Sequence, residues 1–391
     1  MAKLINLKSF KEFLNSSTGG GMLLFLCLIV SLTIANTSLA DSFNNLLATK
    51  LGFENESIQL NYSIAAWIND GLMAIFFLLV GLEIKRELVE GELSSPRQAA
   101  LPILAAIGGA IIPASIYILF NHNQETHHGW AIPMATDIAF ALAVINLLGK
   151  RVPVALKVFL AALAIVDDLL AILVIAFFYS SDLHLTYMLY AAIGMGVLIA
   201  FNRFGVKQIW MYLIPGVFIW YFVHHSGIHA TIAGVLVAMT LPTTPDDKES
   251  PLEKLEHLLV KPVNFIIVPL FALANTNITF QSEMIGGLSS PMGLGIILGL
   301  VLGKTIGIFT TSWICVKSGL AQLPEMTKWS HIVGVGMLGG IGFTMSIFVS
   351  LLSFDDALHI EEAKLAVLIG SLISGICGYI FLNALSKKSA N

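Results

Sequence analysis

The chain has 391 residues, of which 56% are hydrophobic and only 12% charged, and its mean hydropathy is +0.83. That apolar fraction excludes an ordinary soluble domain and is typical of a membrane-embedded protein. The formal net charge of −4 carries little information by itself, and no nucleic-acid partner is expected. Cys27, Cys315 and Cys377 lie in separate apolar runs without CxxC or Cys/His spacing, which excludes a disulfide framework and a cysteine metal site.

Twelve apolar stretches are long enough to cross a bilayer, which takes about 20 residues. The connections between them are mostly short, so the sequence predicts one all-α polytopic membrane domain over residues 1–391. The first stretch also resembles a cleaved signal peptide, but its length favours a retained span. The expected spans are 19–39, 62–84, 99–120, 128–148, 153–179, 186–202, 208–223, 226–241, 257–275, 292–316, 330–353 and 361–385.

The basic residues divide unevenly between alternate connections. One side holds only Lys50 and Lys364, and the other holds eighteen. An excess of Lys and Arg marks the cytoplasmic side, so both termini are expected in the cytoplasm. The eighteen are Lys3, Lys8, Lys11, Lys85, Arg86, Arg97, Lys150, Arg151, Lys157, Arg203, Lys207, Lys248, Lys254, Lys261, Lys317, Lys328, Lys387 and Lys388.

Charged residues also occur deep inside the predicted spans. Asp167 and Asp168 are adjacent, about 22 Å from the cytoplasmic end of the fifth span, and the same count places Lys304 about 18 Å deep and Asp137 about 17 Å deep. A charged side chain near the bilayer centre costs at least about 2.5 kcal/mol, so such residues usually mark an ion or proton pathway. A buried structural ion pair is the alternative.

Two predicted spans contain features that break helices. Pro133 stands midway in the fourth span, just before Thr136 and Asp137, and removes a backbone hydrogen bond. The eleventh span carries a run of glycines that predicts unwinding, although close helix packing also uses glycine. These glycines are Gly334, Gly336, Gly339, Gly340 and Gly342.

The two broken spans are the middle members of two trios, spans 3–5 and 10–12. Corresponding members are seven spans apart, so the trios have opposite orientations, and discontinuous helices in inverted repeats point to an ion site at mid-membrane. Helix ends carry partial charges. We therefore expect Asp137 to offset helix N-termini at the crossing and Lys304 to offset C-termini.

Six segments together resemble the NhaA family of sodium/proton antiporters, and the similarity runs from about Ser9 to Leu385. They are WINDGLMAIFFLLVGLEIKREL, MATDIAFALAV, AIVDDLLAILVIAFFY, HSGIHATIAGV, GLVLGKTIGI and GGIGFTMSIF. The resemblance implies a secondary active antiporter in a bacterial inner membrane that exports Na+ and Li+ in exchange for external protons. It implies no cofactor beyond the transported ions.

The resemblance also implies roles for particular residues. Asp167 and Asp168 match the ion-binding carboxylates, and Asp137, Thr136 and Lys304 complete the expected set of ion- and proton-binding residues. Other matched positions have alternatives in the sequence: a bond to a neighbouring helix for Asp70, packing for His229, and an ordinary solvated helix end for the cytoplasmic charges. Accessory pathway positions are Asp70 and Gly342, and the pH-sensing positions are Glu83, Arg86, Glu87, Glu256, His257 and His229.

The residues themselves suggest a mechanism. Na+ prefers oxygen ligands, and Asp167 and Asp168 supply them together with Thr136. Adjacent helical residues point about 100° apart, so one acid is expected to dominate, and we assign Asp168 as the main ligand. Protonation of both acids, or of one acid and Lys304, would make the exchange electrogenic.

The longest polar connection is the outer loop over residues 40–61. The segment ATKLGFENESIQLN suggests two strands around a turn near Asn55. In the family a hairpin at this place joins two protomers, so a homodimer is expected, and an ordinary loop is the alternative.

Two other functions were weighed against transport of sodium. A proton-coupled carrier of a small organic solute would need an intramembrane cluster of Asn, Gln or Arg, and the predicted spans have none. An intramembrane aspartyl protease would carry Gly-x-Gly-Asp, which is absent, as are HExxH and GxSxG. The sequence therefore does not predict an enzyme.

Overall fold

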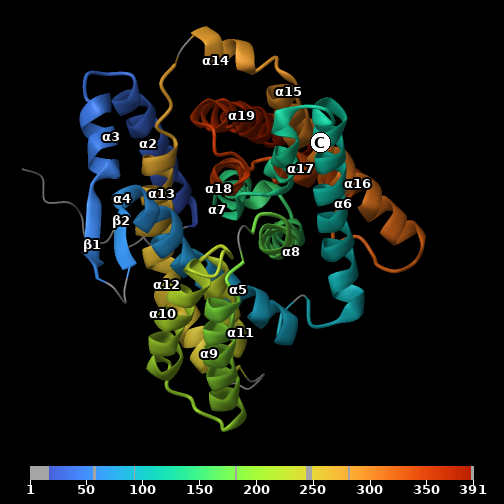
Figure 1. Cartoon of the computed structure of the whole chain (residues 1–391). Helices are drawn as coiled ribbons and strands as arrows, with labels where there is room; N and C mark the ends of the chain where they lie inside the picture. The colour runs from blue at the N-terminus through green and yellow to red at the C-terminus, as the bar shows by residue number, and fades with distance from the viewer. Residues whose placement is uncertain are drawn as a thin grey trace, which may run out of the picture. The chain divides into compact units, whose positions relative to one another are not determined.

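The computed structural model describes residues 17–55, 59–91, 93–180, 183–243, 249–280 and 282–388. The predictions that concern Lys3, Lys8, Lys11, Lys248 and the two chain ends lie outside the described residues. Contacts divide the chain into two compact units, one of Met1–Leu26, Ser95–Ala171 and Phe280–Asn391 and one of Cys27–Ser94 and Ile172–Thr279. We call these unit 1 and unit 2 and describe each separately (Figure 1).

Unit 1 is built from helices in its described residues. Its elements are α6 (Pro96–Asn121), η2 (Glu125–Met134), α7 (Ile138–Leu147), η3 (Gly149–Arg151), most of α8 (Val154–Phe178), α14 (Ser282–Gly287), α15 (Pro291–Leu298), η5 (Gly299–Gly303), α16 (Lys304–Lys317), α17 (Trp329–Gly339), α18 (Phe343–Ser353) and α19 (Ala357–Lys388).

Close backbone contact joins α6 to α16 in unit 1. A Cβ atom added at Gly307 would lie 2.1 Å from the carbonyl oxygen of Gly108, so only glycine fits there. The two helices run side by side in Figure 1. This contact fixes the helix that begins with Lys304.

Unit 2 combines helices with one pair of strands. Its elements are the second half of α2 (Ser17–Ala35), whose first half belongs to unit 1, α3 (Ala40–Ala48), β1 (Lys50–Glu54), β2 (Gln59–Ser63), α4 (Ile64–Ala66), η1 (Trp67–Leu72), α5 (Met73–Val89), α9 (Leu185–Arg203), α10 (Trp210–His224), α11 (Ile232–Thr240), α12 (Pro251–Pro262), η4 (Val263–Ile267) and α13 (Val268–Asn275).

The strands occupy the loop in which the sequence suggested them. β1 and β2 are antiparallel, with Lys50 opposite Ser63 and Glu54 opposite Gln59. All five residues of β1 are exposed. Residues 56–58, between the two strands in the sequence, lie outside the described part of the chain.

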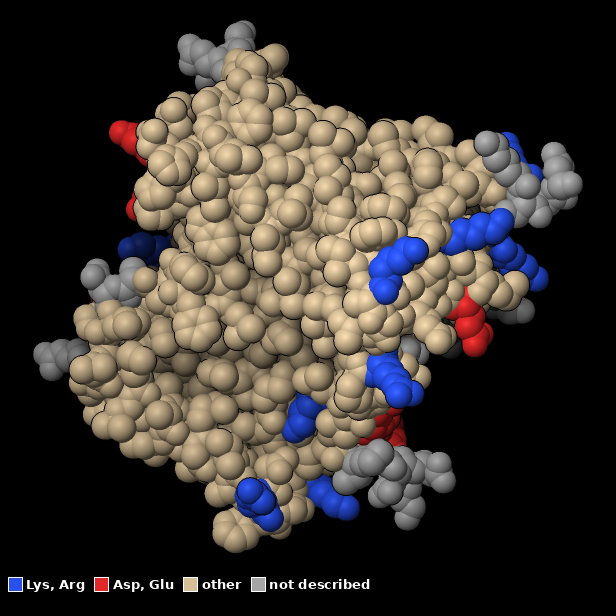
Figure 2. Space-filling model, turned by 90° about the vertical axis from the view of Figure 1, so that its right-hand side faces the viewer, with Lys and Arg blue, Asp and Glu red and all other residues tan. Residues whose placement is uncertain are grey.

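Seven described helices, or runs of contiguous helix, are long and apolar enough to cross a membrane, and the number is up to ten if each bent helix pair counts as one span. Most helices begin and end close to the residues predicted from the sequence; for example, the predicted span 153–179 is observed as Val154–Phe178. The predicted 226–241 contains a shorter helix, Ile232–Thr240, because residues 226–231 form turns and Gly227 has φ of +85°. The face in Figure 2 carries few charged side chains, as a protein in contact with lipid requires.

Candidate ion-binding site

The two predicted helix breaks are confirmed, and they contact each other in unit 1. The helices η2 and α7 meet at an angle of 43°, and α17 and α18 meet at 47°. The backbone N–H of Asp137, in the first break, donates to the carbonyl oxygen of Ile341 in the second at 2.7 Å. The breaks therefore bring backbone and side-chain oxygens from four half-helices together.

Asp137 caps two helices at once. Its Oδ1 accepts from the N–H of Phe140 at 2.9 Å, at the start of α7. Its Oδ2 accepts from the N–H of Thr344 at 3.1 Å and from the Thr344 hydroxyl, at the start of α18. A carboxylate placed there offsets the partial positive charge of two helix N-termini, as the sequence suggested.

Asp167 is held by a cation and a hydroxyl. Lys304 Nζ donates to Asp167 Oδ2, and the two side chains are 0% and 1% exposed. The Thr136 hydroxyl lies 2.5 Å from the same oxygen and 2.8 Å from the carbonyl oxygen of Gly339, which ends α17. Because threonine has one hydroxyl hydrogen, Thr136 can donate to only one of these two oxygens at a time.

Asp168 follows Asp167 on α8 and is 1% exposed. Asp168 lies close enough to Lys304 to interact with its charge. Lys304 was expected to offset helix C-termini, but its hydrogen bond goes to Asp167 and not to carbonyl groups at the end of α17. Asp167 Oδ1 has no hydrogen-bond partner among the described residues. The two acids therefore differ in their surroundings, because Asp167 accepts the hydrogen bond of Lys304.

A π-helical segment, η5, precedes Lys304. The N–H of Lys304 donates to the carbonyl oxygen of Gly299, five residues earlier. Such segments are often found at functional sites, since they turn the following side chain relative to a regular helix. Gly299 packs so closely against Pro133 that an added Cβ would lie 2.7 Å from its ring.

A second group of charges lies in unit 2 and joins α5 to α12. Arg86 Nε donates to both carboxylate oxygens of Glu256 at 2.9 and 3.1 Å, and Arg86 Nη1 lies 3.2 Å from Glu87 Oε1. Glu83 lies within electrostatic range of all three residues. His257 points elsewhere: its Nδ1 lies 3.0 Å from Glu249 Oε1, and its side chain is 70% exposed.

The remaining predicted residues are dispersed. Asp70 lies in the π-helical η1, and its carbonyl oxygen accepts from the Trp220 indole at 3.1 Å. His229 Nε2 lies 2.7 Å from the carbonyl oxygen of Tyr179. Gly342 belongs to the break before α18, where a Cβ would lie 2.2 Å from Ser346 Oγ.

Sequence analysis missed three hydroxyl residues of the site in unit 1. Thr344 lies in the first turn of α18, just after the glycine run, and its place beside the predicted break is the signal by which it could have been found. Ser346 donates to the carbonyl oxygen of Ile132 at 2.7 Å, and Ser371 accepts from the N–H of Phe343 at 3.0 Å. Single serines in apolar helices give no signal of such contacts.

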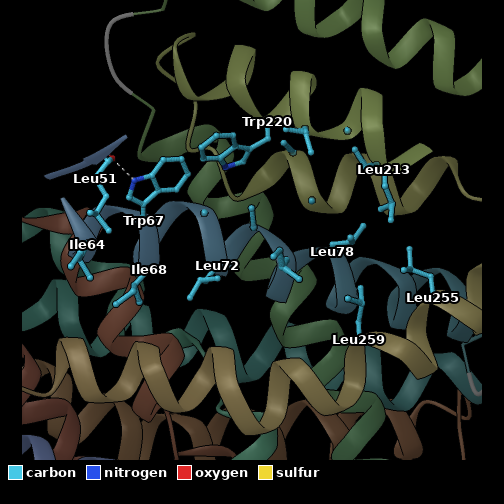
Figure 3. Close-up of a pocket in the computed structure, with 18 residues that line it drawn as sticks. Leu51, Ile64, Trp67, Ile68, Leu72, Leu78, Leu213, Trp220, Leu255 and Leu259 are labelled. Atoms are coloured by element: carbon cyan, nitrogen blue, oxygen red, sulfur yellow. Dashed lines mark hydrogen bonds between the residues drawn. The ribbon is translucent and has the colours of Figure 1, made fainter. Parts of the chain in front are cut away.

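A cavity of about 640 Å³ lies in unit 2 and does not resemble an ion site. Its lining consists of apolar side chains and glycine, with Trp67 and Trp220 toward the end near Leu51 (Figure 3). Both indole N–H groups donate to backbone carbonyl oxygens, those of Leu51 and Asp70. None of the lining side chains offers a ligand for a cation. Across the described residues, no cluster of three or more His, Cys, Asp or Glu could hold a metal ion.

Comparison with known proteins agrees with this geometry. Residues 11–382 match the family model described as Na+/H+ antiporter 1. The chain is 63% identical over 389 residues to Na+/H+ antiporter NhaA 2 of Flavobacterium johnsoniae, covering 99% of this chain and 95% of the relative. It is 48% identical over 384 residues to Na+/H+ antiporter NhaA of Pelagibacter ubique, with 97% and 98% coverage. It is also 48% identical over 380 residues to Na+/H+ antiporter NhaA of Flavobacterium psychrophilum, with 97% coverage of each.

Proposed function

Because the chain belongs to the NhaA family of Na+/H+ antiporters, we propose that it exports Na+ and Li+ from a bacterium in exchange for external protons. The observation that carries this proposal is the pair Asp167 and Asp168, buried beside two broken helices together with Lys304. Two acids and one lysine have a net negative charge when all three are ionised. That net charge gives the site its capacity for a transported cation.

The transported ion would be bound mainly by Asp168. Na+ is a hard cation that prefers oxygen ligands. Asp168 supplies the charge, while Asp167 Oδ1 and the Thr136 hydroxyl can add further oxygens. Asp137 stays with the helix N-termini that it caps, so it shapes the site without binding the ion.

Exchange follows from competition for the same oxygens. A carboxylate removed from water is stabilised either by a proton or by a cation. Loading of Na+ from the cytoplasm displaces protons, and loading of protons from outside displaces Na+, provided that the site opens to one side at a time. With more protons than Na+ per cycle, carried by both acids or by one acid and Lys304, the exchange is electrogenic.

Regulation by pH is assigned to the unit 2 charges and to His229. Arg86 binds Glu256 and Glu87 while Glu83 lies near them, so the loss or gain of a proton changes the balance of charge between α5 and α12. Asp70 and Gly342 are assigned to the ion pathway.

The proposed assembly has twelve spans, inverted repeats, cytoplasmic termini and a place in the inner membrane. It is also a homodimer, for which β1, exposed at all five residues and paired with β2, offers a strand to a second hairpin. Deleting residues 45–58 is expected to yield monomers in cross-linking and light-scattering measurements. A dimer that survives this deletion contradicts the assignment.

The direct test of function uses everted membrane vesicles from cells that lack other Na+/H+ antiporters. Respiration acidifies the vesicle lumen and quenches a pH-sensitive dye. Addition of Na+ or Li+ is expected to restore fluorescence over a range of pH, and K+ is not. The absence of any cation-evoked response at every pH would refute the proposed function.

A further inference from the structure

The half-helix α18 begins without a capping side chain of its own. Its N-cap residue is Gly342, and a Cβ atom at that position would lie 2.2 Å from Ser346 Oγ. The first N–H groups of a helix have no partner within the helix, and buried ones are costly when unpaired. The acceptors for these groups must therefore come from other parts of unit 1.

Ser371 of α19 supplies two of these contacts. Its Oγ accepts from the N–H of Gly342 at 3.2 Å and from the N–H of Phe343 at 3.0 Å, and the residue is 6% exposed. The next N–H, that of Thr344, donates to Asp137. A hydroxyl oxygen has two lone pairs, so both are used here. The positive end of α18 is thus divided between a neutral serine and one carboxylate.

The break between α17 and α18 is linked to Asp167 through Thr136. The break starts after Gly339, whose carbonyl oxygen lies 2.8 Å from the Thr136 hydroxyl, and the same hydroxyl lies 2.5 Å from Asp167 Oδ2. A shift at the start of α18 therefore moves the Gly339 carbonyl and, with it, the hydroxyl that orients Asp167.

We propose that Ser371 is a positioning residue of the Na+ site, an inference that rests on the proposed function. By holding the N–H groups of Gly342 and Phe343, it fixes the break between α17 and α18. Thr136 and Asp167 keep their geometry as a result. Ser371 acts through these residues and does not bind the ion.

Ser374 offers a matched control on the same helix. It lies three residues after Ser371, is 1% exposed, and its Oγ has no hydrogen-bond partner among the described residues. It also faces the same break, because a Cβ at Gly340 would lie 2.6 Å from its Oγ. Removal of the Ser374 hydroxyl loses no hydrogen bond, whereas removal of the Ser371 hydroxyl leaves two buried N–H groups unpaired.

The experiment compares S371A, S374A and S371T in everted vesicles, with the KM for Na+ and the maximal rate measured separately. S371A is expected to raise KM about tenfold, the size set by leaving buried donors unpaired, with the maximal rate changed less than about twofold. A rise in KM at constant maximal rate indicates lost binding geometry and not lost protein. S374A is expected to match the wild type, and S371T, which keeps the hydroxyl, to lie close to it.

Equal KM values for S371A and S374A, or a fall in the maximal rate of S371A at unchanged KM, would overturn the proposal. If S371A does not reach the membrane, S371C replaces it, since its thiol has similar size and is a weak acceptor. S371C is then expected to raise KM, and an unchanged KM counts against the proposal. Wild-type vesicles that respond to no cation would overturn the proposed function itself, which is a separate result.

Discussion

Two ion pairs of similar chemistry lie in different surroundings in the two units. In unit 1, the side chains of Lys304 and Asp167 are 0% and 1% exposed; in unit 2, those of Arg86 and Glu256 are 35% and 8% exposed. Water can solvate Arg86 if Glu256 loses its charge, but it cannot reach Lys304. The buried pair of unit 1 is therefore suited to exchanging one bound cation or proton for another. The partly exposed pair of unit 2 is suited to adjusting activity with pH.

The largest expected effect comes from removing the acid that is assigned as the main ligand. Asp168→Asn should lower Na+-evoked proton exchange at least about 100-fold, because the transported cation loses the carboxylate that supplies its charge. Dye dequenching in everted vesicles measures this. Asp355→Asn is the matched control, since Asp355 is exposed in the connection before α19. Exchange within about tenfold of the wild type in Asp168→Asn would contradict the assignment.

The next effect concerns stability and separates the two ion pairs. Lys304→Met leaves Asp167 buried without its cation, which typically costs about 3–5 kcal/mol. The apparent unfolding temperature in detergent should fall accordingly. Adding Asp167→Asn removes the second charge and should restore much of the loss. A double variant as unstable as the single one would show that the pair is not coupled.

A smaller loss is expected from the partly exposed pair. Arg86→Gln should cost about 1 kcal/mol in the same measurement, because solvent screens charges near the protein surface. Lys304→Met and Arg86→Gln measured side by side test the comparison directly. Equal losses of unfolding temperature would show that burial does not distinguish the pairs.

The smallest effects concern the pH profile. Glu256→Gln removes one of the two acids that contact Arg86 and leaves Glu87 as its partner, so the pH midpoint of activation should shift. His257→Gln should shift the midpoint less, since His257 contacts exposed Glu249 instead. Vesicle assays over a pH series give both midpoints. A larger shift for His257→Gln would move the regulatory role to that histidine.

Much of the fold could be predicted because bilayer thickness constrains helix length. The observed Pro96–Asn121 and Pro291–Lys317 lie within three residues of the predicted 99–120 and 292–316. The breaks were predicted from Pro133 and the glycine run, which act locally on the backbone. The short helix Ile232–Thr240 was not, because hydropathy does not detect the turn at Gly227. The number of spans and their repeat relation stay predictions.

The site could be predicted only as a set of residues. Helical rise placed Lys304, Asp137 and the two acids at similar depth, but depth cannot decide which acid Lys304 binds. That choice depends on how α8 and α16 are rotated about their axes, and the π-helical segment Gly299–Gly303 before Lys304 was not predicted from the sequence. The contacts of Ser371 depend on the packing of α19 against the break, because Ser371 is 28 residues from Phe343 in the sequence.

The most direct test of the central claim, that Na+ and protons compete at Asp168, is the KM for Na+ measured over a pH series. Where the site is mostly protonated, competition by one proton predicts that KM rises about tenfold for each unit of falling pH, and competition by two protons predicts up to about a hundredfold, while the maximal rate stays constant. In proteoliposomes, exchange rates measured over a series of Na+ concentrations that extends to saturation give the KM and the maximal rate at each pH. A KM that is independent of pH, with a maximal rate that falls on acidification, would contradict the account.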